Sequence, residues 1–420
     1  MTELVRHTRL ENGVRVVTET VRDVPSVALG IWVDIGSRYE EERSCGIAHF
    51  VEHLLFKGTP TRTARGIAEE IERRGGSIDA FTDKEYTCYH ARVLHDQATT
   101  ALEILSDIVM HAEPRAEDIE TEREVVIQEI LDVEDDPEEY VHDHLLSSYW
   151  PGHPLGWPVA GTIASVEQIT REDILAFLRD FRRPDRIVVA AAGRLDHDEM
   201  VAHCQRIFGS LEPRNGLERS FDRPDFRPGL YVVKREIEQA HLLIGLPGLS
   251  VTDPRREAAE VLIAALGGGM SSRLFQRIRE ERGKAYSIYA FQDPFHDIGY
   301  TGIYAACARD AVTEVSDIVF AELRAIAREG LAPGELDRVR TQLVGSIPLA
   351  LETTDSRMSR IGRNEIYFDK PLSLEEIVRD IEAVTNDDIV ALAHELFSFD
   401  RAAAVLLGDV EAGLVALPVL

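Results

Sequence analysis

The sequence has no long run of apolar residues, and its amino terminus has no basic segment followed by an apolar stretch. A helix that crosses a membrane needs about 20 consecutive apolar residues, and a secretion signal needs the basic and apolar pattern. We therefore expect no membrane span, no membrane partner and no secretion signal.

Cysteine is also scarce. The four cysteines, Cys45, Cys88, Cys204 and Cys307, lie far apart and form no C-x-x-C pair. This spacing argues against a disulfide framework and against a thiol redox motif. It is typical of small buried residues in a reduced compartment, so we expect a cytoplasmic protein.

Basic residues are outnumbered, with 46 Lys and Arg against 74 Asp and Glu and a formal net charge of -28. Nucleic acid phosphates would be repelled by this charge, so we expect no nucleic acid partner. An acidic surface favours solubility, although acidic groups that line a cavity would also favour cationic partners. The 420 residues, 44% of them hydrophobic, are enough for about two to four domains with their own cores.

Two histidines stand four residues apart around a carboxylate, in the order His49, Glu52, His53. On an α-helix this spacing places both imidazoles on one face, as two ligands of a single Zn²⁺ require. Glu52 lies near the same face, where it can take a proton from water at the metal. No proline or glycine interrupts residues 47–57, which are rich in apolar side chains, so we predict a helix. The order matches the inverzincin signature H-x-x-E-H.

A catalytic zinc needs a third protein ligand and one open position. Residues 116–134 have apolar side chains at helical spacing, which predicts a long amphipathic helix. Glu122 and Glu129 are seven residues apart in this segment and share a face. Glu129 is the best candidate for the third ligand, although an isolated acidic residue is more often a solvated surface group.

An internal repeat appears at an offset of 215 residues, where residues 166–174 parallel residues 381–389 without a gap. Thr170 and Thr385 each begin an S/T-x-x-D pattern typical of a helix start. Each helix is then followed by an apolar strand. The repeat, with strands and helices of ordinary length in both halves, favours an α+β fold of two homologous domains from an internal duplication. We expect each domain to be a mostly antiparallel sheet covered by helices on one face.

The repeat also predicts the domain boundaries. We expect a zinc-binding catalytic domain at residues 1–208, a linker at 209–229 that is rich in Gly, Pro, Arg and Asp, and a homologous domain at 230–420. In the second half, the stretch around Glu260 corresponds to the histidine helix, and the region of Ser346 corresponds to Glu129. Neither carries a metal ligand set, so we expect the second domain to lack the metal and to contact substrate.

Two further motifs have simpler explanations. The glycines at 267–269 precede a helix, but the Lys and Ser or Thr of a phosphate-binding P-loop are missing. We expect them to end a helix and to allow close approach of another backbone. His142 and His144 are two residues apart, which sends them to different helix faces, so we expect surface residues.

The metal motif and three longer segments resemble the pitrilysin, insulinase and mitochondrial processing peptidase family of zinc peptidases, in its short bacterial form. FVEHLLFKGT at 50–59 resembles the family's motif helix, and GGSIDAFT at 75–82 resembles its substrate strand. RGKAYS at 282–287 resembles its downstream Arg and Tyr pair. One departure is Asp79, where many members carry Asn.

The resemblance implies a zinc metalloendopeptidase that hydrolyses extended peptides or unfolded segments in an enclosed chamber, with one Zn²⁺ per chain. It assigns His49, His53 and Glu129 to the metal, and Glu52 to general base catalysis. Glu122 would orient a ligand without binding the metal itself. Arg282 and Tyr286 would hold a substrate carbonyl or the oxyanion. The implied substrate strand consists of Ser77, Ile78, Asp79, Ala80, Phe81 and Thr82.

Relatives of this length associate in pairs, so the resemblance also implies a homodimer in which Arg282 and Tyr286 of one subunit face the zinc of the other. A different class of function stays open: a non-catalytic scaffold or partner subunit of a peptidase complex. A third possibility is a zinc enzyme dedicated to one specialised peptide precursor.

Overall fold

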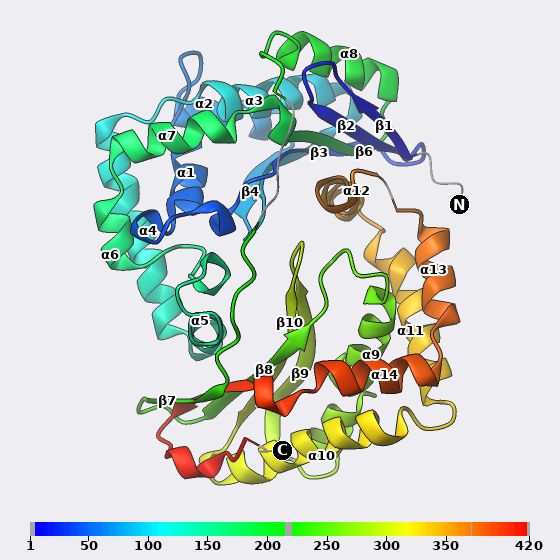
Figure 1. Cartoon of the computed structure of the whole chain (residues 1–420). Helices are drawn as coiled ribbons and strands as arrows, with labels where there is room; N and C mark the ends of the chain where they lie inside the picture. Colours follow the sequence, from blue (N-terminus) through cyan, green and yellow to red (C-terminus); the bar gives the residue numbers. More distant parts are fainter. Residues whose placement is uncertain (1–4, 215–220, 371, 418–420) are drawn as a thin grey trace. The chain divides into compact units, whose positions relative to one another are not determined.

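The computed structural model describes residues 5–214, 221–370 and 372–417, which form two compact units (Figure 1). Unit 1 contains residues 1–131, 157–220 and 349–373, and unit 2 contains residues 132–156, 221–348 and 374–420. Each unit has one β-sheet with helices packed on it. The predicted α+β fold class is therefore confirmed.

The sheet of unit 1 has six strands in the order β1-β2-β6-β3-β5-β4. Only β2 and β6 pair in parallel, and the other neighbours are antiparallel. β4 has a single neighbour and forms one edge of the sheet. The strands are β1 (Val5–Arg9), β2 (Arg15–Thr20), β3 (Ser26–Val33), β4 (Ser77–Thr82), β5 (Thr87–Leu94) and β6 (Ile187–Gly193).

The expectation of helices on one face only is wrong for this sheet, because alternate residues of β3 point to opposite faces and contribute to two different cores. Leu29 and Ile31 of β3 belong to the core shared with the helices of the first half of the chain. Trp32 belongs to a second core on the opposite face, where Met358 and Ile361 of α12 (Thr354–Phe368) pack. The other helices are α1 (Ile47–Leu55), α2 (Ala64–Glu72), α3 (Ala98–His111), most of α4 (Ala116–Asp135), α6 (Ile163–Gln168), α7 (Arg171–Phe181) and α8 (His197–Phe208).

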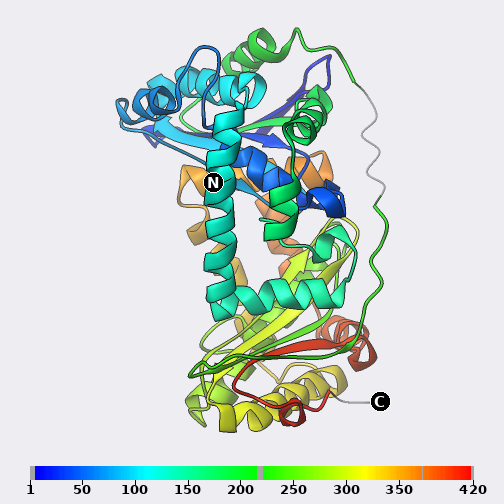
Figure 2. The same ribbon diagram turned by 90° about the vertical axis from the view of Figure 1, so that its left-hand side faces the viewer.

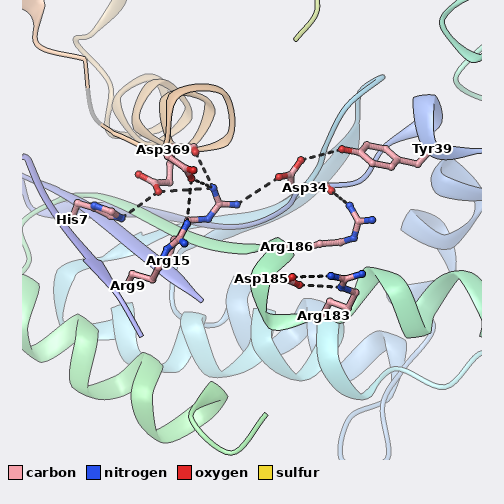
Figure 3. Close-up of polar contacts among 10 residues, drawn as sticks. His7, Arg9, Arg15, Asp34, Tyr39, Arg183, Asp185, Arg186 and Asp369 are labelled. Atoms are coloured by element: carbon pink, nitrogen blue, oxygen red, sulfur yellow. Dashed lines mark hydrogen bonds and ion pairs between the residues drawn. The ribbon is translucent and has the colours of Figure 1, made fainter. Parts of the chain in front are cut away.

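Charged groups also attach α12 to the sheet (Figure 3). Arg15 of β2, only 2% exposed, donates from Nη1 to the backbone oxygen of Glu365 at 3.0 Å and to Asp369 Oδ1 at 2.8 Å. Glu19, also buried in β2, pairs with Arg357 and, at 3.1 Å, with Arg360. Buried ionic groups must be paired to be tolerated, so these contacts specify where α12 lies on this sheet.

Unit 2 has a five-stranded sheet in the order β7-β11-β8-β10-β9. One face packs on helices of the second half of the chain, and the other face packs on α5 through Leu145 and its neighbours. The strands are β7 (Gly229–Lys234), β8 (Ala240–Gly248), β9 (Ala285–Pro294), β10 (Gly299–Cys307) and β11 (Ala403–Gly408). The helices are α5 (Pro137–Tyr149), α9 (Arg256–Gly267), the π-helical turn η6 (Phe275–Glu280), α10 (Val312–Glu329), most of α11 (Glu335–Ala350), α13 (Leu374–Ala383) and α14 (Asn386–Leu396).

The two sheets repeat one topology. The order β2-β6-β3-β5-β4 in unit 1 matches the order β7-β11-β8-β10-β9 in unit 2, strand for strand along the chain. Both helix starts predicted from the repeat are capping boxes, formed by Thr170 with Asp173 and by Thr385 with Asp388. The internal duplication read from the sequence is therefore visible in the fold.

The compact units nevertheless exchange segments across the predicted domain boundary. α5 comes from the first half of the chain, directly after α4 (Figure 2), yet it belongs to unit 2. α12 comes from the second half, yet it belongs to unit 1. The boundaries at 208 and 230 follow the sequence repeat, whereas the cores pair each sheet with one helix of the other half. In the predicted linker, residues 215–220 lie outside the described residues.

Some smaller predictions can be compared with the fold. α9 ends at Gly267, where an added Cβ would lie 2.4 Å from the backbone nitrogen of Ala290, so the expected close approach is present. The expectation that His142 and His144 are surface residues is wrong. Both are half-buried, and His142 Nε2 lies 3.2 Å from Tyr289 Oη beneath α5. All four cysteines are free and buried. No helix among the described residues is long and apolar enough to span a bilayer.

Candidate metal centre

The start of α1 is fixed by a buried carboxylate. Glu40 accepts hydrogen bonds from the backbone amides of Gly46 and Ala48, both at 2.8 Å. Such bonds satisfy amides that a helix leaves free at its first turn. Burial raises the pKa of Glu40 to about 8, against the effect of these two amides and of Lys84. Gly46 has a φ of 93°, and a Cβ there would meet the Ala160 carbonyl oxygen at 2.5 Å, so the entry to the helix requires glycine.

α1 and α4 are held together by their apolar faces. Phe50 and Leu54 of α1 share one core with Val126 and Ile130 of α4. The guanidinium of Arg123 in α4 lies 5.5 Å from the centre of the Phe50 ring. This packing places one polar face of each helix side by side, with the two histidines on one and the two glutamates on the other.

The nitrogen and oxygen atoms needed for a metal meet at this junction. The rings of His49 and His53 have centroids 4.7 Å apart. Glu129 Oε2 lies 3.7 Å from His49 Nε2 and 3.4 Å from His53 Nε2. Tetrahedral Zn²⁺ with ligands at about 2.0 to 2.1 Å separates its ligand atoms by about 3.3 Å. The three side chains therefore fit a zinc ion in both chemistry and spacing.

His53 also contacts a buried carboxylate on its other nitrogen. Its Nδ1 lies 3.2 Å from Glu122 Oε2, and the second oxygen of Glu122 pairs with the ammonium of Lys57. A carboxylate partner at Nδ1 fixes the proton there and leaves Nε2 with a free electron pair. Glu122 therefore lies where the sequence predicted a group that orients a ligand.

His49 is neutral over the physiological range. Burial, with a smaller contribution from neighbouring His53, lowers the pKa of His49 to about 4. Its Nδ1 is buried and has no hydrogen-bond partner among the described residues. A neutral imidazole is the form that binds a metal, so His49 needs no deprotonation near neutral pH.

Glu52 lies beside the cluster on α1 and contacts the end of β4. Its Oε2 accepts a hydrogen bond of 2.5 Å from the Thr82 hydroxyl. Burial raises the pKa of Glu52 above its ordinary value. The Thr82 hydrogen bond and His53 act in the opposite direction, while Asp79 and Glu129 raise the pKa further. A carboxylate with a raised pKa beside a metal site is a stronger base than an exposed one.

The predicted substrate strand coincides with β4, whose bounds are Ser77–Thr82. β4 pairs only with β5, so one side of its backbone has no strand neighbour in the sheet. Asp79 is exposed, and its Oδ1 accepts a hydrogen bond from the Ala80 amide at 2.9 Å. The structure thus brings the end of the strand to the Glu52 carboxylate, while binding of substrate by β4 stays a prediction.

Arg282 and Tyr286 both lie in unit 2. Arg282 donates to the backbone oxygen of Arg277 at 2.7 Å and pairs with Glu281 at 3.1 Å. Tyr286 is on the edge strand β9, where it is 75% exposed. Their role toward the metal of a partner subunit stays a prediction.

Sequence reasoning missed three contacts at the centre. These are the pairing of Lys57 with Glu122, the hydrogen bonds that Glu40 accepts at the start of α1, and the hydrogen bond from the Thr82 hydroxyl to Glu52. Lys57 lies four residues after His53, so helical spacing was an available signal. Glu40 and the bond between Thr82 and Glu52 depend on long-range packing that no local pattern indicates. Among the described residues, only His49, His53 and Glu129 form a cluster with ligand atoms this close.

Comparison with known proteins points to one family. Residues 15–163 match the model of the insulinase family, peptidase family M16, and residues 168–343 match the M16 inactive domain. The chain is 38% identical to the uncharacterized zinc protease YmxG of Bacillus subtilis over 96% of this chain and 98% of that protein. It is 42% identical to the uncharacterized zinc protease Rv2782c of Mycobacterium tuberculosis over 96% of this chain and 92% of that protein.

Solved structures agree on the fold. A protease from Helicobacter pylori superposes with a TM-score of 0.89 at 20% identity, covering 97% of this chain and all of that one. A chain of complex III2 from Candida albicans superposes with a TM-score of 0.85 at 23% identity, covering 98% of each. Because two family models together match most of the sequence and full-length relatives exceed 30% identity, the chain belongs to the M16 family of peptidases, the pitrilysin and insulinase family.

Proposed function

We propose that this chain is a zinc metalloendopeptidase of the inverzincin type that hydrolyses extended peptides or unfolded protein segments. The single observation that carries this proposal is the junction of His49, His53 and Glu129 with the Glu52 carboxylate beside it. The names of relatives as zinc proteases support the choice of metal.

His49, His53 and Glu129 would hold one Zn²⁺, leaving a fourth position open. When bound, the metal supplies a Lewis acid that polarises a peptide carbonyl and makes water more acidic. Glu122 keeps the proton of His53 on Nδ1 and so presents Nε2 to the ion.

Glu52 is the proton carrier. As a carboxylate it takes a proton from the attacking water, and as a carboxylic acid it passes that proton to the leaving amine. Burial, which raises the pKa of Glu52, favours the first step, because the group takes up a proton more readily than an exposed glutamate.

The substrate would bind as an added strand along the open edge of β4. Backbone hydrogen bonds then fix the register of the scissile bond without requiring particular side chains. This mode suits unfolded segments, which have free backbone groups, and excludes folded domains.

Arg282 and Tyr286 would support the substrate carbonyl or the oxyanion from a second subunit, across the enclosed chamber of a homodimer in the cytoplasm. Mixing Glu52→Gln chains with Arg282→Ala chains tests this arrangement. Recovery of activity in the mixture supports a shared site, and no recovery contradicts it.

Hydrolysis of a mixed set of unfolded peptides by the zinc-loaded chain tests the function itself. Glu52→Gln and a chelator serve as controls, and cleavage lost in both supports the proposal. Peptides left intact by a stoichiometric zinc protein would point to a dedicated precursor or a missing partner. A chain that binds no zinc would be the scaffold.

A further inference from the structure

Glu52 has one fixed partner, the hydroxyl of Thr82, which donates to Oε2 at 2.5 Å. No other hydrogen bond to this carboxylate is found within residues 5–214, 221–370 and 372–417. Glu52 is half-buried, so water has limited access to it. The orientation of the carboxylate therefore depends on this one bond.

Thr82 is itself held firmly. It is the last residue of β4 and pairs with Thr87 on β5. Thr87 is fully buried, and its hydroxyl donates to the Ile35 backbone oxygen at 3.0 Å. A β-branched side chain has few χ1 rotamers, so the sheet fixes where the Thr82 hydroxyl points.

From this geometry we infer that Thr82 is a positioning residue for the general base. Its hydroxyl occupies Oε2 of Glu52 and leaves Oε1 as the oxygen that receives the proton. Without this donor, the carboxylate can rotate about its side-chain bonds and spends less time aligned with the attacking water. The inference rests on the proposed peptidase function.

Positioning of Glu52 differs from the role that the resemblance implies for Thr82, which is binding of substrate as part of the strand. A residue that binds substrate changes KM, whereas a residue that acts only through Glu52 changes kcat. The Thr82 hydroxyl is engaged by Glu52, so it is not available to a peptide as a donor.

The experiment compares Thr82→Val, which keeps the shape and removes the hydroxyl, with Thr82→Ser, which keeps the hydroxyl. We expect Thr82→Val to lower kcat by about 10 to 100-fold, the usual effect of a hydrogen bond to a charged group, with KM and zinc content unchanged. Thr82→Ser should restore most of kcat.

Thr301→Val is the matched control. Thr301 lies in β10 of unit 2, fully buried, and its hydroxyl has no hydrogen-bond partner among the described residues. Replacing the Thr301 hydroxyl by a methyl group should leave kcat and KM unchanged.

Three kinetic results would overturn the inference: an unchanged kcat in Thr82→Val, an effect on KM alone, or no rescue by serine. If the wild-type chain binds zinc but cleaves no peptide of the set, the result points to a dedicated precursor or a missing partner, and crystal structures then test the inference. A single Glu52 orientation in the wild type and several in Thr82→Val support it, whereas the same single orientation in both contradicts it.

Discussion

The two units share one sheet topology, but their helices at corresponding places carry different side chains. In unit 1, α1, the first α-helix after β3 along the chain, carries His49, Glu52 and His53, and α4 supplies Glu129. In unit 2, α9 occupies the corresponding place in the chain order and carries buried aliphatic residues such as Val261 and Leu262. The comparison teaches that one sheet topology can be built either with a cluster of metal-binding side chains or with buried aliphatic side chains at this place, so the topology itself does not require the cluster.

The strongest test of this difference removes a ligand from unit 1. In His53→Ala the cluster keeps two of its three ligand atoms, so we expect loss of bound zinc and of all measurable peptidase activity. The fold should persist, because the described part of unit 2 has the same sheet topology with no such cluster. Elemental analysis of the purified protein and its circular dichroism spectrum check both expectations. A variant that unfolds would show that the centre is needed for folding.

Glu52→Gln separates chemistry from metal binding. Glutamine keeps the size of the side chain and removes the base, so kcat should fall by about 10² to 10⁴-fold. Zinc should stay bound at the wild-type ratio because Glu52 is not one of the clustered ligands. Steady-state kinetics with zinc analysis on the same sample measures both. Wild-type kcat in this variant would remove Glu52 from the mechanism.

The contact of Glu122 with His53 predicts an effect on affinity. Glu122→Gln should weaken zinc binding by about 10 to 100-fold, as is usual when a partner of a ligand histidine is lost. Competition with a chelator of known affinity provides the measurement.

Lys57→Met changes the same contact in the opposite direction. It removes a positive charge near the metal and leaves Glu122 a better acceptor for His53, so zinc should bind more tightly. The same chelator competition applies, and weaker binding would contradict this account of the pair.

Asp79 predicts a smaller effect on the pH profile. Its charge raises the pKa of Glu52, so Asp79→Asn should lower that pKa. Because the base is active when deprotonated, the acid limb of kcat/KM should move to lower pH, by less than about one unit for a single exposed charge. A profile between about pH 4 and pH 8 records the shift. Movement of the limb to higher pH would contradict the assignment.

The smallest effect is expected in unit 2. Glu260 of α9 stands where the repeat places the metal helix, and burial raises the pKa of its carboxyl group. Glu260→Gln should leave zinc content and kcat unchanged, because no histidine lies near it in the sequence. A fall in zinc content would break the contrast between the two units.

The sequence was informative where one helix determines geometry. The spacing of His49 and His53, and that of Glu122 and Glu129, predicted two faces that do meet in the structure. Repeated patterns predicted the duplicated topology and both capping boxes. The sequence could not show which sheet an amphipathic helix covers, so the exchange of α5 and α12 was missed. It also could not show that Thr82 reaches Glu52, 30 residues away, because only the pairing of β4 with β5 places that hydroxyl.

The exchange of α5 and α12 makes the two halves of the chain mutually dependent. A fragment of residues 1–208 would leave Trp32 and its neighbours without Met358 and Ile361, and it would leave Arg15 and Glu19 without their charged partners. A fragment of residues 230–420 would lack the cover that Leu145 and Trp150 provide. Neither half is thus a self-sufficient folding unit. Each half supplies a helix that covers the sheet of the other half, so the second half serves the fold of the first even where it carries no metal ligands.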